Sequence, residues 1–198
     1  MKQQASLNPF ENKVVLITGG TAGIGRATAI AFAEQGARVV VTGRREAEGA
    51  ESVALIEQAG SKGIFVRGDV SREEDSAEAV SRALEQYGRL DFAFNNAGVS
   101  LESGAFTETS GDVFDSIMNI NVRGVFFGMK HQIPALLKSG GGAIVNNASV
   151  LGIRPTGRNR FTTRASLPLS VLRNRWRSSM RARAFASMRC VLRLPRRI

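Results

Sequence analysis

The sequence TGGTAGIG at residues 18–25 joins a short apolar run, residues 14–17, to an Ala-rich segment with helical spacing, residues 24–35. The apolar run predicts a buried strand, and the glycines predict a tight turn that leads into a helix. Such a turn lets the backbone approach a pyrophosphate closely, and the helix N-terminus offers N–H groups and a positive dipole end to the phosphates. A tight strand-to-helix connection can also be purely structural, so the turn alone leaves nucleotide binding open.

Strands and helices continue to alternate along the chain after this turn. We expect further strands at residues 39–41, 64–66, 90–94 and 143–146, and helices at 46–59, 71–87 and 112–138. Ser71 and Glu74 form a capping-box pattern at the start of the helix at 71–87. This alternation predicts an α/β fold, a Rossmann-type doubly wound parallel sheet with helices on both faces, over residues 11–153.

The two ends of the chain do not follow this pattern. We expect a flexible N-terminus at residues 1–10, a sheet truncated after its fifth strand, and a poorly ordered basic tail, irregular or partly helical, at 154–198. The last strand would then expose an edge that invites aggregation.

Charge is spread unevenly over the chain, whose net charge is +10. Residues 1–153 hold 14 Lys and Arg and all 17 Asp and Glu, whereas residues 154–198 hold 13 Arg and no acid. The basic balance therefore belongs to the tail alone and is a poor indicator of nucleic-acid binding by the whole chain.

The sequence also indicates a compartment. No apolar run reaches the roughly 18 residues of a membrane helix, and residues 1–10 lack the apolar core of a signal peptide. The one cysteine, Cys190, cannot form an internal disulfide. We therefore expect a cytoplasmic protein without a membrane partner.

Five segments occur in an order and at spacings that resemble the classical short-chain dehydrogenase/reductase family, over about residues 11–153. They are TGxxxGxG at 18–25, Asp69-Val70, NNAG at 95–98, NVRG at 121–124 and IVNNAS at 144–149. Each could be structural by itself, since an Asp after a strand often caps a helix and Asn-Gly pairs often form turns.

The resemblance implies an NAD(P)-dependent oxidoreductase that transfers a hydride between the nicotinamide and a small-molecule alcohol or carbonyl substrate. It implies a homo-oligomer in intact relatives, which is doubtful for this chain, and no metal. The cofactor-binding residues that it implies are Gly19, Thr21, Gly23, Ile24, Gly25, Asp69, Val70, Asn95, Ala97 and Gly98.

The end of the second predicted strand bears on the choice of cofactor. Family members that prefer NAD usually carry an acid there, whereas this chain has Thr42-Gly43-Arg44-Arg45. An arginine can bind a 2′-phosphate through two parallel hydrogen bonds. We therefore expect NADP rather than NAD, with Arg44 and Arg45 as the binding residues, although both could be solvated loop charges.

The resemblance also implies a catalytic set of Asn, Ser, Tyr and Lys, of which Asn121 and Ser149 match the first two. In the family the asparagine helps to hold a proton-relay water, the serine binds the substrate oxygen, and a lysine lowers the pKa of the tyrosine. The tyrosine should follow the serine by thirteen residues, at Thr162. The only tyrosine in the chain is Tyr87, and no lysine follows Lys138, so this pair is absent.

We hypothesise that the tail is a frameshifted continuation of the family's coding sequence. With permitted codons, the shifted frame can turn residues 175–191 into VALEYAxxGIRVNAVCP and residues 161–166 into YxASK, which resemble the family's missing segments. The slip would lie between Arg154 and Arg160. Such a chain would not turn over, and its substrate cannot be inferred, because the loops that select it are missing or variable.

One alternative is a non-catalytic nucleotide-binding protein. Its Arg-rich arm, with arginines at 173, 175, 177, 181 and 183 beside Trp176, would bind nucleic acid or an acidic membrane. We consider nucleic acid the less favoured partner, because the shifted frame already explains the arm.

Overall fold

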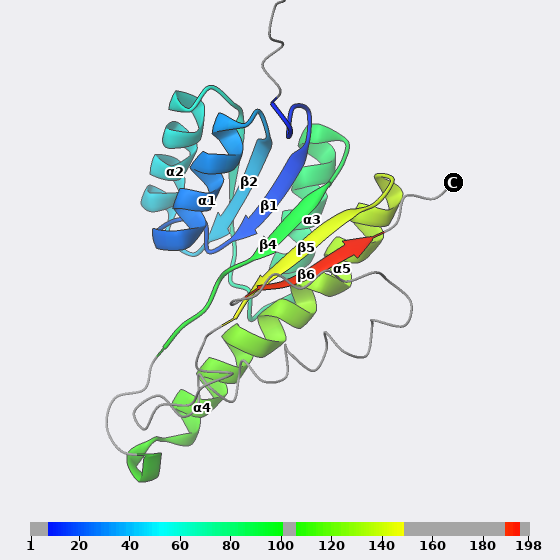
Figure 1. The fold of residues 1–198 in the computed structure, drawn as a ribbon. Helices are drawn as coiled ribbons and strands as arrows, with labels where there is room; N and C mark the ends of the chain where they lie inside the picture. Colours follow the sequence, from blue (N-terminus) through cyan, green and yellow to red (C-terminus); the bar gives the residue numbers. More distant parts are fainter. Residues whose placement is uncertain (1–7, 101–105, 149–188, 195–198) are drawn as a thin grey trace, which may run out of the picture.

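A computed structural model describes residues 8–100 and 106–148, together with the backbone of residues 189–194. One sheet has the strand order β3-β2-β1-β4-β5-β6 (Figure 1). Its strands are β1 (Val14–Thr18), β2 (Arg38–Gly43), β3 (Gly63–Arg67), β4 (Phe92–Asn95), β5 (Gly142–Asn147) and β6 (Arg189–Leu194). The helices are α1 (Gly23–Glu34), α2 (Glu46–Gln58), α3 (Glu73–Tyr87), α4 (Gly111–Met118) and α5 (Gly124–Lys138), with a 3₁₀ turn, η1, at Phe106–Glu108.

The first five strands are parallel, which confirms the predicted Rossmann-type sheet. α1 and α2 lie on one face, and α3 and α5 lie on the other (Figure 1). Both faces of β1 are buried, because alternate side chains of this strand enter different cores. Val14 and Leu16 pack toward α3 and α5, whereas Val15 and Ile17 pack toward α1 and α2. β1 is thus central to both cores.

β6 corrects the expectation that the sheet ends at its fifth strand. It pairs with β5 in antiparallel register, with Gly142 opposite Leu194 and Asn147 opposite Arg189. A strand edge offers unpaired N–H and C=O groups, and a segment of the tail satisfies them here. The edge of β5 that was expected to be exposed is therefore paired.

The predicted helix at 112–138 is interrupted in its middle. A π-helical segment, η2 (Asn119–Arg123), separates α4 from α5, and the N–H of Gly124 donates to the carbonyl of Asn119, five residues back. π-helical turns are rare and occur frequently at functional sites. This one contains Asn121, the predicted catalytic asparagine.

The start of α3 differs from the predicted capping box. The helix begins at Glu73, and its N-cap, Arg72, makes no side-chain capping bond. The N–H and hydroxyl of Ser71 instead donate to Oδ1 of Asp69, at 3.0 and 2.8 Å. Ser71 is thus engaged by the carboxylate at the end of the third strand, so the capping-box prediction was wrong.

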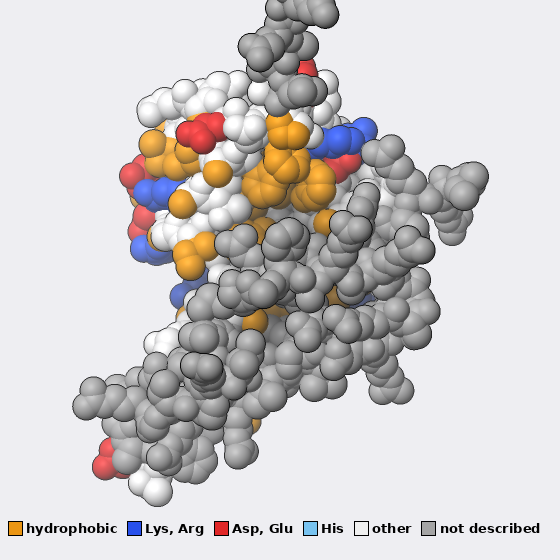
Figure 2. Space-filling view, viewed as in Figure 1, with side chains coloured by type: hydrophobic (Ala, Val, Ile, Leu, Met, Phe, Trp, Pro, Cys, Tyr) orange, Lys and Arg blue, Asp and Glu red, His pale blue; other side chains and the backbone are white. Residues whose placement is uncertain are grey.

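Apolar side chains gather on the surface near the start of β1 (Figure 2). The ring of Phe10 lies 4.9 Å from that of Phe32 and 5.4 Å from that of Phe92, in edge-to-face geometry. Ile24, 63% exposed, belongs to the same apolar surface of α1. Phe10 therefore packs with the sheet domain, although the flexible N-terminus was predicted to extend to this residue. Across the described ranges, no helix is both long and apolar enough to span a membrane.

Candidate nucleotide-binding site

A pocket lies at the carboxyl ends of the central strands. It is formed by the ends of β1, β2, β3 and β4 and by η2, and its lining residues are Gly19, Thr42, Gly43, Arg44, Gly68, Asp69, Val70, Ala97, Gly98, Val99 and Ile120. β1 pairs with β2 on one side and β4 on the other, so the chain reverses its direction of winding here. Crevices at such switch points bind ligands in open α/β sheets.

Three predicted glycines of the 18–25 turn have different local roles. Gly19 has φ +66°, and a Cβ there would lie 2.9 Å from Cα of Ala97. A Cβ on Gly25 would lie 2.1 Å from the carbonyl oxygen of Gly19. Gly23 also has a left-handed φ, +50°, but a Cβ there would meet nothing within 4 Å among the described residues. Gly19 and Gly25 thus allow close packing, whereas Gly23 leaves the N-terminus of α1 open to a ligand.

Polar contacts fasten this turn to the neighbouring strand ends. The hydroxyl oxygen of Thr18 accepts hydrogen bonds from the N–H groups of Asn96 and Ala97, at 3.0 and 3.1 Å. The Asn96 amide donates to the carbonyls of Thr18 and Gly19, at 3.2 and 3.3 Å. Thr21, another predicted cofactor residue, is buried and does not line the pocket. These bonds join the ends of β1 and β4 into one rigid wall.

Asp69 and Arg44 face each other across the side of the pocket formed by β2 and β3. Oδ2 of Asp69 lies 3.7 Å from Nη1 of Arg44. Burial raises the pKa of Asp69, but hydrogen bonds from Ser71 and the charges of Arg44 and Arg72 outweigh that effect, so the pKa is lowered. Asp69 is therefore an anion at neutral pH and an acceptor for N–H groups of a ligand.

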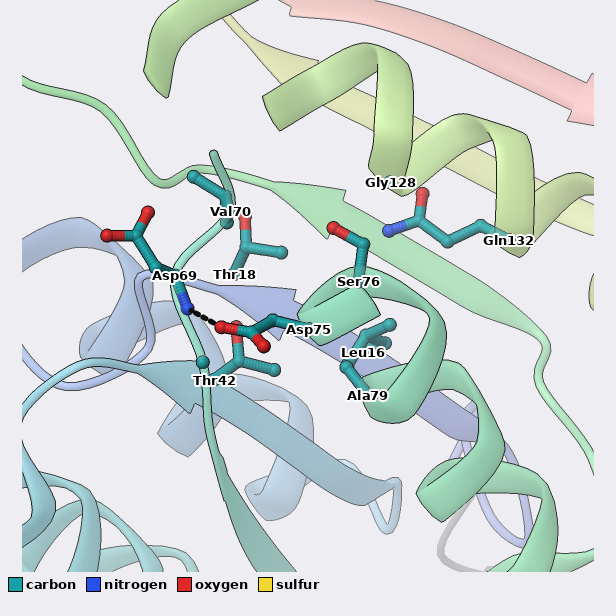
Figure 3. A pocket seen from close by; sticks show the side chains of 11 residues that line it. Leu16, Thr18, Thr42, Asp69, Val70, Asp75, Ser76, Ala79, Gly128 and Gln132 are labelled. Carbon is teal, nitrogen blue, oxygen red and sulfur yellow. Dashed lines mark hydrogen bonds between the residues drawn. The ribbon is translucent and has the colours of Figure 1, made fainter. Parts of the chain in front are cut away.

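A small cavity lies beneath this pocket, between the sheet, α3 and α5 (Figure 3). Asp75 enters it from α3, and its carboxylate accepts the N–H of Asp69 at 2.7 Å. Val70 packs onto the first residue of α5, because a Cβ on Gly124 would lie 2.8 Å from Cγ2 of Val70. The loop after β3 is thus anchored to both helices of this face.

The two arginines after β2 are placed differently. The side chain of Arg44 is 66% exposed and lines the pocket. Arg45 lies outside the lining, and its guanidinium pairs with Glu48, one turn into α2, at 2.8 Å. Arg44 is therefore the arginine available to a ligand phosphate.

Asn95 belongs to a buried amide cluster and does not line the pocket. Its Nδ2 donates to Oδ1 of Asn146 at 2.8 Å and to Oε1 of Gln132 at 3.1 Å. Nε2 of Gln132 donates back to Oδ1 of Asn95 at 2.8 Å. All three residues are at least 96% buried, and the absence of a side chain at Gly128 makes room for them. The cluster ties β4, β5 and α5 together behind the pocket.

Asn121 holds the chain where it leaves β4. Its Nδ2 donates to the carbonyl of Val99 and its Oδ1 accepts the N–H of Val99, both at 2.8 Å. Its Oδ1 would lie only 3.3 Å from a Cβ on Gly98. The amide therefore supports the pocket wall formed by Gly98 and Val99.

The rest of the expected catalytic set cannot be placed. Ser149 and Thr162 lie outside the described residues, as do the expected slip at 154–160 and the arginines at 173–183. Tyr87 is described, and it lies at the end of α3 with the guanidinium of Arg38 over its ring, 5.8 Å from the centroid. Because Arg38 begins β2, Tyr87 lies near the opposite end of the strands from the pocket.

Several contributors were not singled out from the sequence. Thr42, Gly68, Val99 and Ile120 line the pocket, and Asn96, Gln132 and Asn146 support it. Gly68 directly follows β3 and Thr42 is the penultimate residue of β2, so a position at the carboxyl end of a parallel strand is a signal that could have found these two. Gln132 gives no such signal, because an amide in a helix is ordinary.

The sequence matches a family model described as short chain dehydrogenase over residues 13–160. A 3beta-hydroxysteroid dehydrogenase of Mediterraneibacter gnavus is 42% identical over 145 residues, which are 73% of this chain and 52% of that protein. The chain spans just over half the length of such curated relatives.

Solved structures show the same likeness. Levodione reductase superposes with a TM-score of 0.82 at 33% identity, over 86% of this chain and 67% of that chain. NAD+-bound xylitol dehydrogenase superposes with a TM-score of 0.81 at 27% identity, over 84% of this chain and 64% of that chain.

Proposed function

This chain belongs to the short-chain dehydrogenase/reductase family, and on that premise we propose that it carries the cofactor-binding half of an NADP-dependent oxidoreductase. The substrate class would be a small alcohol or its carbonyl product. The observation that carries the proposal is a pocket bordered by Arg44 and Asp69 and lined by Gly19, whose turn continues to the open face of Gly23 four residues on. A left-handed glycine at a helix N-terminus, with no described atom in front of it, suits a pyrophosphate.

The residues fit an NADP molecule along the edge of the sheet. The pyrophosphate would lie against Gly23 and the N-terminus of α1, and Asp69 would accept a hydrogen bond from the adenine amino group. Arg44 would leave Asp69 and bind the 2′-phosphate. When bound, the nicotinamide supplies or accepts a hydride, and Asn121 keeps Gly98 and Val99 in place beside it.

Titration of the purified chain with NADP and NAD tests the choice of cofactor. We expect tighter binding of NADP, and Arg44→Gln should weaken it about tenfold or more, because a charged hydrogen bond contributes about 1.5–3 kcal/mol. Arg45→Gln is the matched control and should bind NADP like the parent, since that side chain pairs with Glu48. Equal affinity for both cofactors, or an unaffected Arg44→Gln variant, would contradict the assignment, and tighter binding of NAD would favour NAD.

We also propose that the chain as written does not turn over, because the Tyr and Lys of the family are missing and its tail is a frameshifted continuation. Two observations support this. The family match ends at residue 160, close to the expected slip, and Tyr87 lies near the wrong end of the strands. Reading the DNA between the codons of Leu151 and Ile198 tests it, and stops or unrelated residues in the shifted frame would exclude a frameshift.

The remaining expectations rest on the sequence alone. Cytoplasmic localisation stays a prediction, which the single cysteine supports because it cannot form an internal disulfide. A homo-oligomer is expected only for intact relatives. An Arg-rich nucleic-acid-binding arm is the alternative, and no binding at low salt would remove it.

A further inference from the structure

Arg26 connects the two ends of the proposed nucleotide site. It lies in the first turn of α1, three residues after Gly23, and its side chain is 20% exposed. We propose that Arg26 is a positioning residue that sets the span between the pyrophosphate end and the 2′-phosphate end of the pocket. This inference rests on the proposed nucleotide-binding function and adds a residue to which the family resemblance gave no role.

The guanidinium of Arg26 makes four contacts with the protein. Nη2 donates to the carbonyl of Thr21 at 2.6 Å and to that of Glu48 at 3.2 Å. Nε donates to the hydroxyl of Ser52 at 3.0 Å, and Nη2 also lies 2.8 Å from a carboxylate oxygen of Glu51. Ser52 is fully buried and donates in turn to the carbonyl of Glu48 at 2.8 Å. One planar group thus joins the glycine turn to the first two turns of α2.

The acceptors that Arg26 holds are adjacent to both phosphate positions. Thr21 precedes Gly23 in the turn, and its Cγ2 would lie 2.6 Å from a Cβ on Gly43, the residue before Arg44. Glu48 is in the first turn of α2, which begins two residues after Arg44. The contacts therefore fix the turn relative to the chain segment that carries Arg44.

The chemistry of these contacts assigns Arg26 a supporting role, because protein oxygens occupy its Nη2 and Nε donors. Its Nη2 and Nε donors point to protein oxygens, and the Glu51 carboxylate offsets its charge. A guanidinium holds several acceptors in a fixed fork, which a lysine ammonium cannot reproduce. When the glycine turn and the Arg44 segment are held at a fixed distance, a ligand that reaches both can bind the second without a further loss of conformational entropy in the protein.

This role predicts a loss that depends on the length of the ligand. In the full chain, Arg26→Gln should weaken NADP about tenfold, because both ends must be engaged together. The affinity for adenosine 2′-monophosphate, which reaches only the Arg44 end, should stay within about twofold. Arg26→Lys should behave like Arg26→Gln toward both ligands and provides a second variant that keeps the charge. Arg82→Gln is the control and should bind both ligands like the parent, since Arg82 pairs with Glu85 on the surface of α3 and lies outside the pocket lining.

The outcomes of these titrations test the role of Arg26 and the nucleotide-binding function separately. Equal losses for both ligands would show that Arg26 only supports the fold, and unchanged NADP affinity would show that it sets no span; either result overturns the inference. If neither Arg26 variant folds, as judged by thermal unfolding, the residue serves stability and the inference also fails. If the parent chain binds neither ligand, the proposed nucleotide-binding function fails. This outcome is distinct from failure of the inference, which is judged on the Arg26 variants alone.

Discussion

Gly23→Ala should separate the stability of the chain from its nucleotide binding. The substitution places a methyl group at a residue with φ +50°, and left-handed backbone costs an L-residue about 1–2 kcal/mol. No further cost is expected, because the new Cβ would meet no described atom within 4 Å. The same methyl group would occupy the space in which the pyrophosphate is proposed to lie, so we expect NADP affinity to fall at least about tenfold, or about 1.4 kcal/mol.

Gly60→Ala is the matched control for this experiment. Gly60 has φ +87°, a Cβ there would also meet no described atom within 4 Å, and it lies between α2 and the start of β3, away from the glycine turn. Urea unfolding should therefore show a similar loss of stability for both variants, whereas fluorescence titration with NADP should show weaker binding for Gly23→Ala alone. If Gly23→Ala binds NADP as tightly as Gly60→Ala, the pyrophosphate does not approach this glycine and the reasoning is wrong.

Two further predictions concern the supports of the pocket, and a third concerns Asp91, which accepts the N–H of Val14 at the opposite, amino-terminal end of β1. Gln132→Leu leaves the Oδ1 of Asn95 without its donor in a buried site, so urea unfolding should show a loss of about 1–3 kcal/mol, and a loss below about 0.5 kcal/mol would contradict the cluster's role. Asn121→Ala removes both bonds to Val99, so amide hydrogen exchange at Val99 should become faster, and unchanged protection would argue against this support. Burial raises the pKa of Asp91, but hydrogen bonds from Arg89 and Val14 and the charges of Arg89 and Lys13 lower this pKa overall. The contribution of Asp91 to stability is therefore present at neutral pH and is lost as the pH falls below about 4. Asp91→Asn should lower the unfolding midpoint at pH 7 and flatten the decline of this midpoint in acid, and an unchanged acid profile would contradict the prediction.

The strongest sequence predictions concerned features that are local in the chain. The apolar runs became β1 to β5, and the order of strands and helices led to the parallel sheet that the structure confirms. The TGGTAGIG turn could be predicted because left-handed backbone and close packing favour glycine whatever the surroundings. Alternation and glycine placement act over a few residues, so they can be recognised without knowing which segments meet.

The tertiary structure decided the features that depend on residues far apart in the chain. Asn95 meets Asn146 and Gln132 only because β4, β5 and α5 pack together, and the pairing of Arg26 with Ser52 requires α1 to lie beside α2. Residues 189–194 form β6 because they pair with the edge of β5, and their own sequence did not predict a strand. The sequence by itself determined the family, the order of elements and the glycine turn; long-range hydrogen bonds and strand edges, which exist only after the layers pack, decided how the pocket is held together.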